Sequence, residues 1–350
     1  MRVNRETLLH ALESVEPGLS KKETIEQSNC FALHDGLVSA FNDETCCHAP
    51  SGLAKDFRGA VQADKVLTLL RKLSEDEIDL DAEDGQLIIK GKSRKAGIRM
   101  ETEITLPIDK VEKPTKWTKL HEDFGEAIGI VYQCAGKDDN MFRLTCVHIT
   151  PRWVEGCDNS QICRWKLQTG ISQPTLVRKT AIKHVTTLGM VDFSETENWL
   201  HFRNPSGLVF SCRRYLEEYP SLSQFLKVEG QPMTLPKGLA EACDKADVFS
   251  SENTDNNFVT VELKAGRVKV RGQGVSGWYN EVKKVDYKGE SLTFNVSPQL
   301  LMELVKRHND CIISADRLKV NGGNYVYVAN LHRPVEKVEK EGEKDESETK

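Results

Sequence analysis

The sequence predicts an α+β fold of three similar domains, each with two helices packed on antiparallel sheets. A segment with the order strand, helix, strand, strand, strand spans 292–331 and occurs twice more upstream. The three copies begin at Val61, Val177 and Val296, so they are 177 − 61 = 116 and 296 − 177 = 119 residues apart. In each copy, apolar residues recur first every three or four positions, as on a helix face, and then every second position, as on a strand face.

The first third of the chain begins with a short strand and an amphipathic helix within residues 1–19. Its apolar residues share one helix face: Leu8, Leu9, Leu12 and Val15. A strand pair is predicted over 29–47, because the Asp-Gly at 35–36 favours a tight hairpin turn. The copy of the repeated unit that starts at Val61 completes this third.

The other two thirds follow the same plan. The predicted helices outside the repeated unit span 120–132 and 239–249, and each is followed by short strands and then by a copy of the unit. The linker composition of KVEKPTK at 110–116 marks the first boundary. We therefore predict domains at 1–112, 113–228 and 229–332. The tail at 333–350 is charged and almost free of apolar residues, so it is predicted to be disordered.

Composition limits the classes of protein. At 350 residues the chain is long enough for two or three domains, and its net charge is −5. It has no run of 18 apolar residues and a charged N-terminus, which predicts neither a membrane span nor a signal peptide. Its ten cysteines lack C-x-x-C pairing, so we expect reduced thiols and a cytoplasmic protein.

The sequence offers only weak support for a catalytic or metal site. Cys46-Cys47-His48, or Cys157 and Cys163 with His148, would be needed for a thiol or metal site, but neither set has the ligand spacing of a zinc site. His121-Glu122-Asp123 lies on a predicted helix, where neighbouring side chains point apart. No phosphate-binding or dinucleotide-binding glycine motif is present. We predict no enzymatic activity, cofactor or metal.

Three stretches resemble a known family. They are FSCRRYLEEYPSLSQFL within 209–226, KGKSRKAGIRM at 90–100, and TFNVSP at 293–298 with the closing strand at 325–331. In order and spacing they are similar to the bacterial DNA sliding clamps, the β subunit of the replicative polymerase, over about residues 1–332. The resemblance implies a head-to-tail homodimeric ring whose helices line a hole for duplex DNA. Its other partners would be a DNA polymerase and a clamp loader, docked through short peptide motifs.

A hole that binds duplex DNA needs positive charge without base readout. The predicted second helices of the three domains carry net positive charge, whereas the first helices are acidic. The candidate DNA-binding residues are therefore Lys21, Lys22, Arg71, Lys72, Arg178, Lys179, Lys183, Lys306 and Arg307. The alternative for each of them is a solvated helix face.

The resemblance also implies a hydrophobic peptide pocket between the middle and last domains. The matching positions are Leu144, Cys157, Asn159, Ser160, Gln161, Ile162, Pro220, Gln224, Phe225, Val326, Val328, Ala329, Asn330 and Leu331. The segment 157–162 replaces the usual Thr-Asp-Gly-His-Arg-Leu, and 328–331 replaces the usual Met-Pro-Met-Arg, so a different peptide preference is expected.

Ring closure would join the first domain of one subunit to the third domain of the other. Leu106, Ile108 and Val111 are candidates for that interface, with an ordinary place in the core as the alternative. A different class of function also stays open, namely a clamp-like scaffold that binds proteins without encircling DNA. The solution mass distinguishes a dimeric ring from such a monomer.

Overall fold

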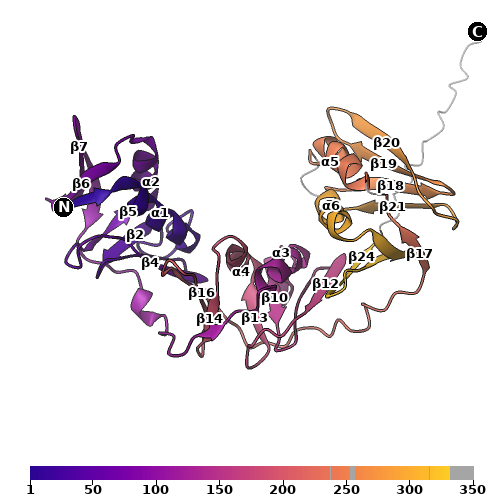
Figure 1. The fold of residues 1–350 in the computed structure, drawn as a ribbon, viewed down its shortest axis with the longest axis horizontal. Helices are drawn as coiled ribbons and strands as arrows, with labels where there is room; N and C mark the ends of the chain where they lie inside the picture. The colour runs from indigo at the N-terminus through magenta and orange to yellow at the C-terminus, as the bar shows by residue number, and fades with distance from the viewer. Residues whose placement is uncertain (237, 253–256, 315, 332–350) are drawn as a thin grey trace, which may run out of the picture. The chain divides into compact units, whose positions relative to one another are not determined.

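A computed structural model describes residues 1–236, 238–252, 257–314 and 316–331, without the side chains of 300, 303, 304, 306 and 307. This part of the chain contains six α-helices and 24 short strands, and its strand pairs are antiparallel (Figure 1). The predicted α+β fold class is confirmed. The chain divides into two compact units, the first at Met1–Leu222 and the second from Ser223 onward.

The first unit holds sixteen of the strands and four of the α-helices. The strands of its first half are β1 (Arg2–Asn4), β2 (Cys30–His34), β3 (Leu37–Phe41), β4 (Thr45–Pro50), β5 (Gly59–Gln62), β6 (Glu77–Glu83), β7 (Gln86–Gly91) and β8 (Arg94–Glu101). Those of its second half are β9 (Thr118–Lys119), β10 (Cys146–Ile149), β11 (Trp153–Cys157), β12 (Gln161–Lys166), β13 (Thr175–Arg178), β14 (Asp192–Glu195), β15 (Trp199–Arg203) and β16 (Val209–Arg213).

The helices of the first half are α1 (Arg5–Val15) and α2 (Ala63–Lys72). Asn4 caps α1, since its side-chain oxygen accepts a hydrogen bond from the Thr7 amide at 2.9 Å. Helix α1 buries an apolar stripe spaced at helical intervals, made of Leu8, Ala11, Leu12 and Val15. A 3-10 turn, η1 (Glu16–Gly18), ends it and leads into the loop that carries Lys21 and Lys22.

Twelve strands of the first unit form one sheet, in the order β1-β6-β7-β8-β5-β2-β3-β4-β16-β15-β14-β9. Its two halves meet where β4 pairs with β16, with Cys46 opposite Ser211 and Cys47 opposite Phe210. We call this β4–β16 pairing the seam. The seam makes residues from both halves of the unit neighbours within a single sheet.

The other four strands of the first unit are ordered β13-β10-β11-β12, and α3 (Phe124–Cys134) packs on β11 and β12. The copy of the repeated unit from Val177 forms only a short helix, α4 (Lys179–Ile182), followed by the 3-10 helix η4 (Lys183–Thr186). The run Val185, Thr186 and Thr187 is β-branched, which disfavours a longer α-helix. The Thr186 and Thr187 hydroxyls also donate to the carbonyls of Lys183 and His184.

The second unit repeats the plan. Its strands are β17 (Gln231–Thr234), β18 (Val259–Lys264), β19 (Arg267–Gln273), β20 (Trp278–Lys284), β21 (Leu292–Val296), β22 (Asp310–Ile313), β23 (Arg317–Asn321) and β24 (Tyr325–Asn330). They are ordered β20-β19-β18-β21 and β24-β23-β22-β17. The helices α5 (Leu239–Ser250) and α6 (Pro298–Arg307) contact each other. The predicted order strand, helix, strand, strand, strand over 292–331 is confirmed.

The segment between the two halves of the first unit packs against the seam. Its residues 104–113 contain the 3-10 turn η2 (Ile108–Lys110), and Leu106, Ile108 and Val111 join a buried cluster with Phe41, Cys46 and Trp199. Only 3% of Leu106 and 8% of each of the other two is exposed. Side chains this buried offer little surface to a second subunit, so the packing favours the alternative, an ordinary place in the core, and a place at the dimer interface stays a prediction.

Candidate nucleic-acid interface

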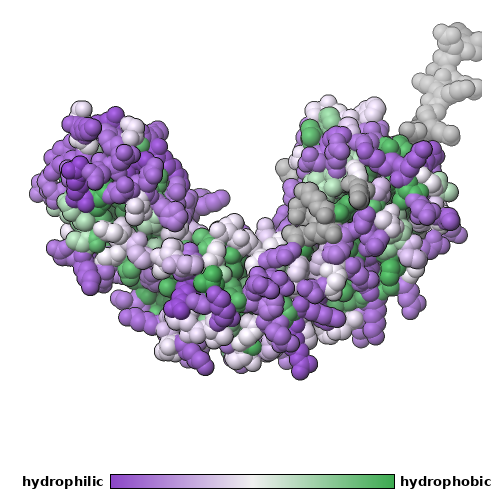
Figure 2. Space-filling model, viewed as in Figure 1, coloured by the Kyte–Doolittle hydropathy of each residue, from purple (hydrophilic) through white to green (hydrophobic). Residues whose placement is uncertain are grey.

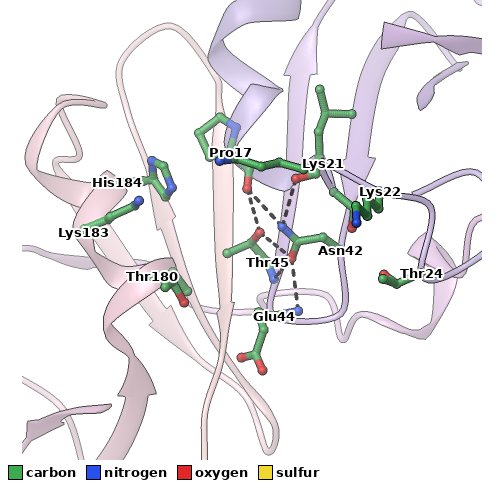
Figure 3. A pocket seen from close by; sticks show the side chains of 13 residues that line it. Pro17, Lys21, Lys22, Thr24, Asn42, Glu44, Thr45, Thr180, Lys183 and His184 are labelled. Atoms are coloured by element: carbon green, nitrogen blue, oxygen red, sulfur yellow. Dashed lines mark hydrogen bonds between the residues drawn. The ribbon is translucent and has the colours of Figure 1, made fainter. Parts of the chain in front are cut away.

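An open hollow of about 560 Å³ lies in the first unit beside the seam. It is lined by η1 and the loop after it, by the β3–β4 turn, and by α4 and η4 (Figure 3). Lys21, Lys22 and Lys183 are exposed residues of its lining. Three of the nine predicted DNA-binding residues are therefore brought together from the two halves of the unit.

A small hydrogen-bond network fixes the centre of the hollow. Asn42 Nδ2 donates to the Pro17 and Leu19 carbonyls at 3.3 and 3.4 Å, and Thr45 Oγ1 donates to the Pro17 carbonyl at 2.9 Å. In Figure 3 these hydrogen bonds lie in the middle of the hollow, with the basic residues of the loop on one side and those of η4 on the other. Because the network holds 17–19, it fixes where the loop with Lys21 and Lys22 begins.

The charge of the hollow comes from the three lysines. Burial, together with the neighbouring charge of Lys183, lowers the pKa of His184 to about 4, so its imidazole is neutral at pH 7. The carboxylate in the lining, Glu44, lies 3.6 Å from Arg178 Nε and accepts hydrogen bonds from the Tyr215 hydroxyl at 3.0 Å. Its charge is thus compensated from within the chain, and the lysines give the hollow a net positive charge.

Arg178 was predicted to contact DNA but is engaged within the chain. Its Nη1 donates to Asp139 Oδ1 and to Thr145 Oγ1, both at 2.8 Å, and its guanidinium lies over the Phe142 ring. Burial alone would lower the pKa of Arg178, but Asp139 and Glu44 outweigh it and raise that pKa. These contacts give Arg178 a structural role within the chain, and its contact with DNA stays a prediction.

Lys179 is engaged as well. Its ammonium donates to the carbonyl of Ala135, the residue that ends α3. A cation at this position stabilises the negative end of a helix dipole. Burial, with repulsion from Lys137 and Lys183, lowers the pKa of Lys179. The first role of this lysine is therefore to join α4 to α3.

The remaining basic candidates divide into three groups. Arg71 bridges α2 to α1 through Glu13 at 2.9 Å and Glu16 at 3.3 Å, and the hydrogen bond with Glu13 raises its pKa. Lys72 is exposed at the end of α2. The side chains of Lys306 and Arg307 lie outside the described residues.

His184 and the uncharged residues that line the hollow were not predicted from the sequence. His184 could have been found, because it directly follows the predicted residue Lys183 in the same helical segment. Asn42 and Thr45 gave no such signal, because only the β3–β4 pairing and the position of Pro17 bring them into the lining.

The predicted peptide-pocket residues fall in both units. In the first unit, Cys157 ends β11 and is buried, Asn159 and Pro220 are exposed, and Leu144, Ser160, Gln161 and Ile162 are half-buried. Asp158 shapes the turn after β11, since its Oδ1 accepts from the amides of Ser160 and Gln161 at 2.7 and 2.9 Å. Ile162, the second residue of β12, then lies directly opposite Cys157.

In the second unit, Gln224 and Phe225 lie before β17, and half of Phe225 is exposed. The other predicted residues belong to β24 and its end. Val328, Ala329 and Leu331 are buried, Val326 is half-buried and Asn330 is exposed. Hydrophilic residues cover most of the surface in view for both units, and hydrophobic residues form small patches (Figure 2).

The cysteine alternatives gain no support from their surroundings. Cys46 and Cys47 are fully buried, and burial raises the pKa of both thiols far above the usual value, so neither forms a thiolate readily. Cys157 also has a pKa raised by burial. Among the residues that the structure describes, no three histidine, cysteine, aspartate or glutamate side chains are grouped to hold a metal ion.

The arrangement of repeated α+β units is the fold of a three-domain bacterial sliding clamp. The β subunit of DNA polymerase III from Thermotoga maritima matches with a TM-score of 0.75 and 16% identity, over 95% of this chain and 99% of that chain. The β chain from Streptococcus pneumoniae matches with the same values. The sliding clamp of Pseudomonas aeruginosa bound to griselimycin has a TM-score of 0.74 at 14% identity, over 95% of this chain and 99% of its own.

At these identities the likeness establishes the fold. No protein-family model matches the sequence, and no curated protein does. In the described part of the chain, no helix has both the length and the apolar character that a membrane crossing requires.

Proposed function

We propose that this chain is a DNA sliding clamp, a homodimeric ring that encircles duplex DNA and tethers a DNA polymerase. The observation that carries the proposal is the likeness to bacterial clamps over 95% of the chain. The lysine-lined hollow supports it, because it offers charge to phosphates without a rigid set of donors for base edges. The domains would be those predicted at 1–112, 113–228 and 229–332, and the tail at 333–350 lies outside the described residues.

The seam suggests how two copies would close the ring. In the first unit, β4, the third strand after α1, pairs with β16, the last strand of the following repeat. In the second unit the corresponding third strand is β20, which pairs with β19 alone among the described strands. The corresponding last strand is β8, whose residues 94–99 pair with β7 only in the described structure. We propose that β20 of one copy pairs with β8 of the other.

The apolar residues on β20 fit an assembly edge. Trp278 is 61% exposed and Val282 is 57% exposed, and both lie on the same face of the strand. Light scattering should give a mass near twice the 39.4 kDa of the chain, and replacement of both residues by aspartate should give a monomer. The control is Val275→Asp in the β19–β20 turn, where the side chain is 93% exposed. Dimers that survive the β20 double substitution would rule out this edge.

Retention on circular DNA tests the hollow. The triple change of Lys21, Lys22 and Lys183 to glutamate should shorten retention and reduce its salt dependence, by a slope of about 0.9 for each phosphate that the chain no longer neutralises. The matched control changes three other exposed lysines to glutamate: Lys55, Lys166 and Lys264. Equal retention by both triple variants would show that the hollow does not face DNA.

Peptide docking is proposed for the residues predicted from the resemblance. Phe225→Ala should weaken binding of a polymerase-derived peptide and leave the dimer intact, because half of this large apolar side chain is exposed. Binding equal to that of the parent chain would remove Phe225 from the site.

A scaffold that binds proteins without encircling DNA is the second candidate. The observation that favours it is the internal neutralisation of Arg71 and Arg178 by carboxylates. A monomeric mass that persists at high concentration, with normal peptide binding, would support the scaffold and exclude encirclement by this chain alone.

A further inference from the structure

A buried carboxylate connects three neighbouring strands of the first unit, β10, β11 and β12. Glu155 on β11 is 2% exposed, and it lies opposite His148 on β10 and Arg164 on β12. His148 Nδ1 donates to its Oε1 at 2.7 Å, and Arg164 Nε donates to its Oε2 at 2.6 Å. Burial alone would raise the pKa of Glu155, but these two hydrogen bonds outweigh it and lower that pKa.

The His148 ring continues this network to the segment after β16. It stacks on Tyr219, with ring centres 4.7 Å apart and an angle of 30° between the rings. Because Glu155 holds one nitrogen of the imidazole, the plane of the ring is fixed, and the stacked Tyr219 ring is fixed with it. Arg143 Nη1 adds a hydrogen bond to the Glu218 carbonyl at 3.2 Å.

The hydroxyl of Tyr219 then reaches the end of β11. It accepts a hydrogen bond from the Cys157 amide at 3.1 Å and lies 3.3 Å from the Cys157 Sγ. Burial raises the pKa of Tyr219, so the hydroxyl stays protonated. Cys157 begins the turn over 157–162 and Pro220 follows Tyr219, so this contact joins the two stretches of the first unit that carry predicted pocket residues.

We infer that Tyr219, held by His148 and Glu155, is a positioning residue for peptide binding on the first unit. A small site for a linear peptide with apolar anchors loses affinity when its walls shift, because binding must then order them. The Tyr219 hydroxyl holds the turn at 157–162 against the chain at Pro220 before any peptide arrives. The inference rests on the proposed function and adds residues that the resemblance did not supply.

The experiment measures the affinity of the parent chain and its variants for the polymerase-derived peptide proposed to dock at Phe225. Tyr219→Phe keeps the ring stacked on His148 and removes the hydroxyl, so it should weaken binding about fivefold to tenfold, chiefly through faster dissociation. Tyr215→Phe is the matched control. It makes the same chemical change four positions earlier, where the hydroxyl donates to Glu44 instead.

A second variant separates the stacked ring from the carboxylate contact. His148→Gln keeps an amide donor for Glu155 and removes the aromatic ring, so it should also weaken binding of the polymerase-derived peptide. Thermal unfolding of each variant shows whether the chain remains folded, and both Tyr→Phe variants should unfold within a few degrees of the parent.

Each result either supports or overturns the inference that Tyr219 is a positioning residue. Weaker binding by Tyr219→Phe with normal binding by Tyr215→Phe supports the inference. Equal affinities in all three proteins, or an equal loss in both Tyr→Phe variants, overturns it while leaving the proposed function intact. A parent chain that does not bind the polymerase-derived peptide overturns the inference together with the peptide site, whereas the mass and the retention on DNA still test the ring independently.

Discussion

Strands β4 and β20 occupy the same position in the repeated architecture, yet one is interior and the other is an edge. β4 pairs with β3 on one side and β16 on the other, and Thr45, Cys46 and Cys47 on it are buried. β20 pairs with β19 alone in the described structure, and every second residue along it is exposed. The difference shows that a second neighbouring strand, rather than the place of a strand in the repeat, sets its burial.

The sequences of the two strands follow that difference. β4 reads TCCHAP, with small residues and one histidine, which suits close packing on both faces. β20 reads WYNEVKK, and its charged end at Lys283 and Lys284 is typical of edges that avoid indiscriminate pairing. The exposed Trp278 and Val282 would then supply selective contact with the correct partner.

The largest expected effect comes from breaking the seam. Phe210 on β16 is fully buried and packs against His184 and Phe202. Phe210→Ala should lower the free energy of unfolding by about 3–5 kcal/mol, because it removes a large apolar side chain from a packed site. Urea denaturation measures this, and a loss below 1 kcal/mol would mean that the seam contributes little to stability.

Acid should weaken the seam next. Burial lowers the pKa of His48 and of His201 to about 4, from an ordinary value of 6.5. His48 faces Ser39, Cys46 and His34, with Asp109 and Lys113 nearby from 104–113, and His201 faces Thr196, Ser211 and Glu112. Between pH 6.5 and 4 the unfolded chain binds protons that the folded chain does not.

The free energy of unfolding should therefore fall as the pH is lowered through that window and level off below pH 4, by up to roughly 3 kcal/mol for each histidine. His48→Gln should remove one share of the decline, measured as the difference between the urea curves of parent and variant at pH 7 and pH 4.5. A difference that does not change with pH would show that His48 does not titrate in this way.

A smaller effect is expected at the end of the seam. Arg213 Nε donates to the Asp43 carbonyl at 2.8 Å, and its guanidinium lies over the Trp199 ring. The side chains of Arg213 and Asp43 are 31% and 58% exposed, so Arg213→Ala should cost about 1 kcal/mol. Arg213→Lys keeps the charge without the planar contact and is the control. A cost above 3 kcal/mol for Arg213→Ala would indicate a role in folding beyond this turn.

The smallest effect is predicted for the edge strand. Trp278→Ala should change the free energy of unfolding of the dilute, monomeric chain by less than about 0.5 kcal/mol, because the side chain is mostly exposed. In concentrated protein the same variant should be less stable than the parent, since only the parent gains from dimerisation. An equal loss at both concentrations would place Trp278 in the core of its own unit.

The repeated unit was predictable because periodicity is local. The spacing of apolar residues over 292–331 was sufficient to predict β21, α6 and the three strands after it. The role of each basic residue was not predictable in this way, because its partner comes from elsewhere in the chain. Arg178 meets Glu44 and Asp139 only through tertiary packing, whereas Lys183 remains exposed five positions later.

For the same reason, the burial of the linking segment, residues 104–113, could not be predicted from the sequence. Leu106, Ile108 and Val111 follow a strand and precede a linker, so a pattern of apolar residues fits an interface and a core equally well. The cluster with Trp199, supplied by β15 of the second half, is what favours the core.

The continuous sheet across the seam has a mechanical consequence. Hydrogen-bonded strands resist stretching and shear along their whole width, so force applied at β1 is carried through β4 and β16 to β14 without a compliant joint. The first unit should therefore respond to an applied force as a single body. Bending must then occur where strands are not paired.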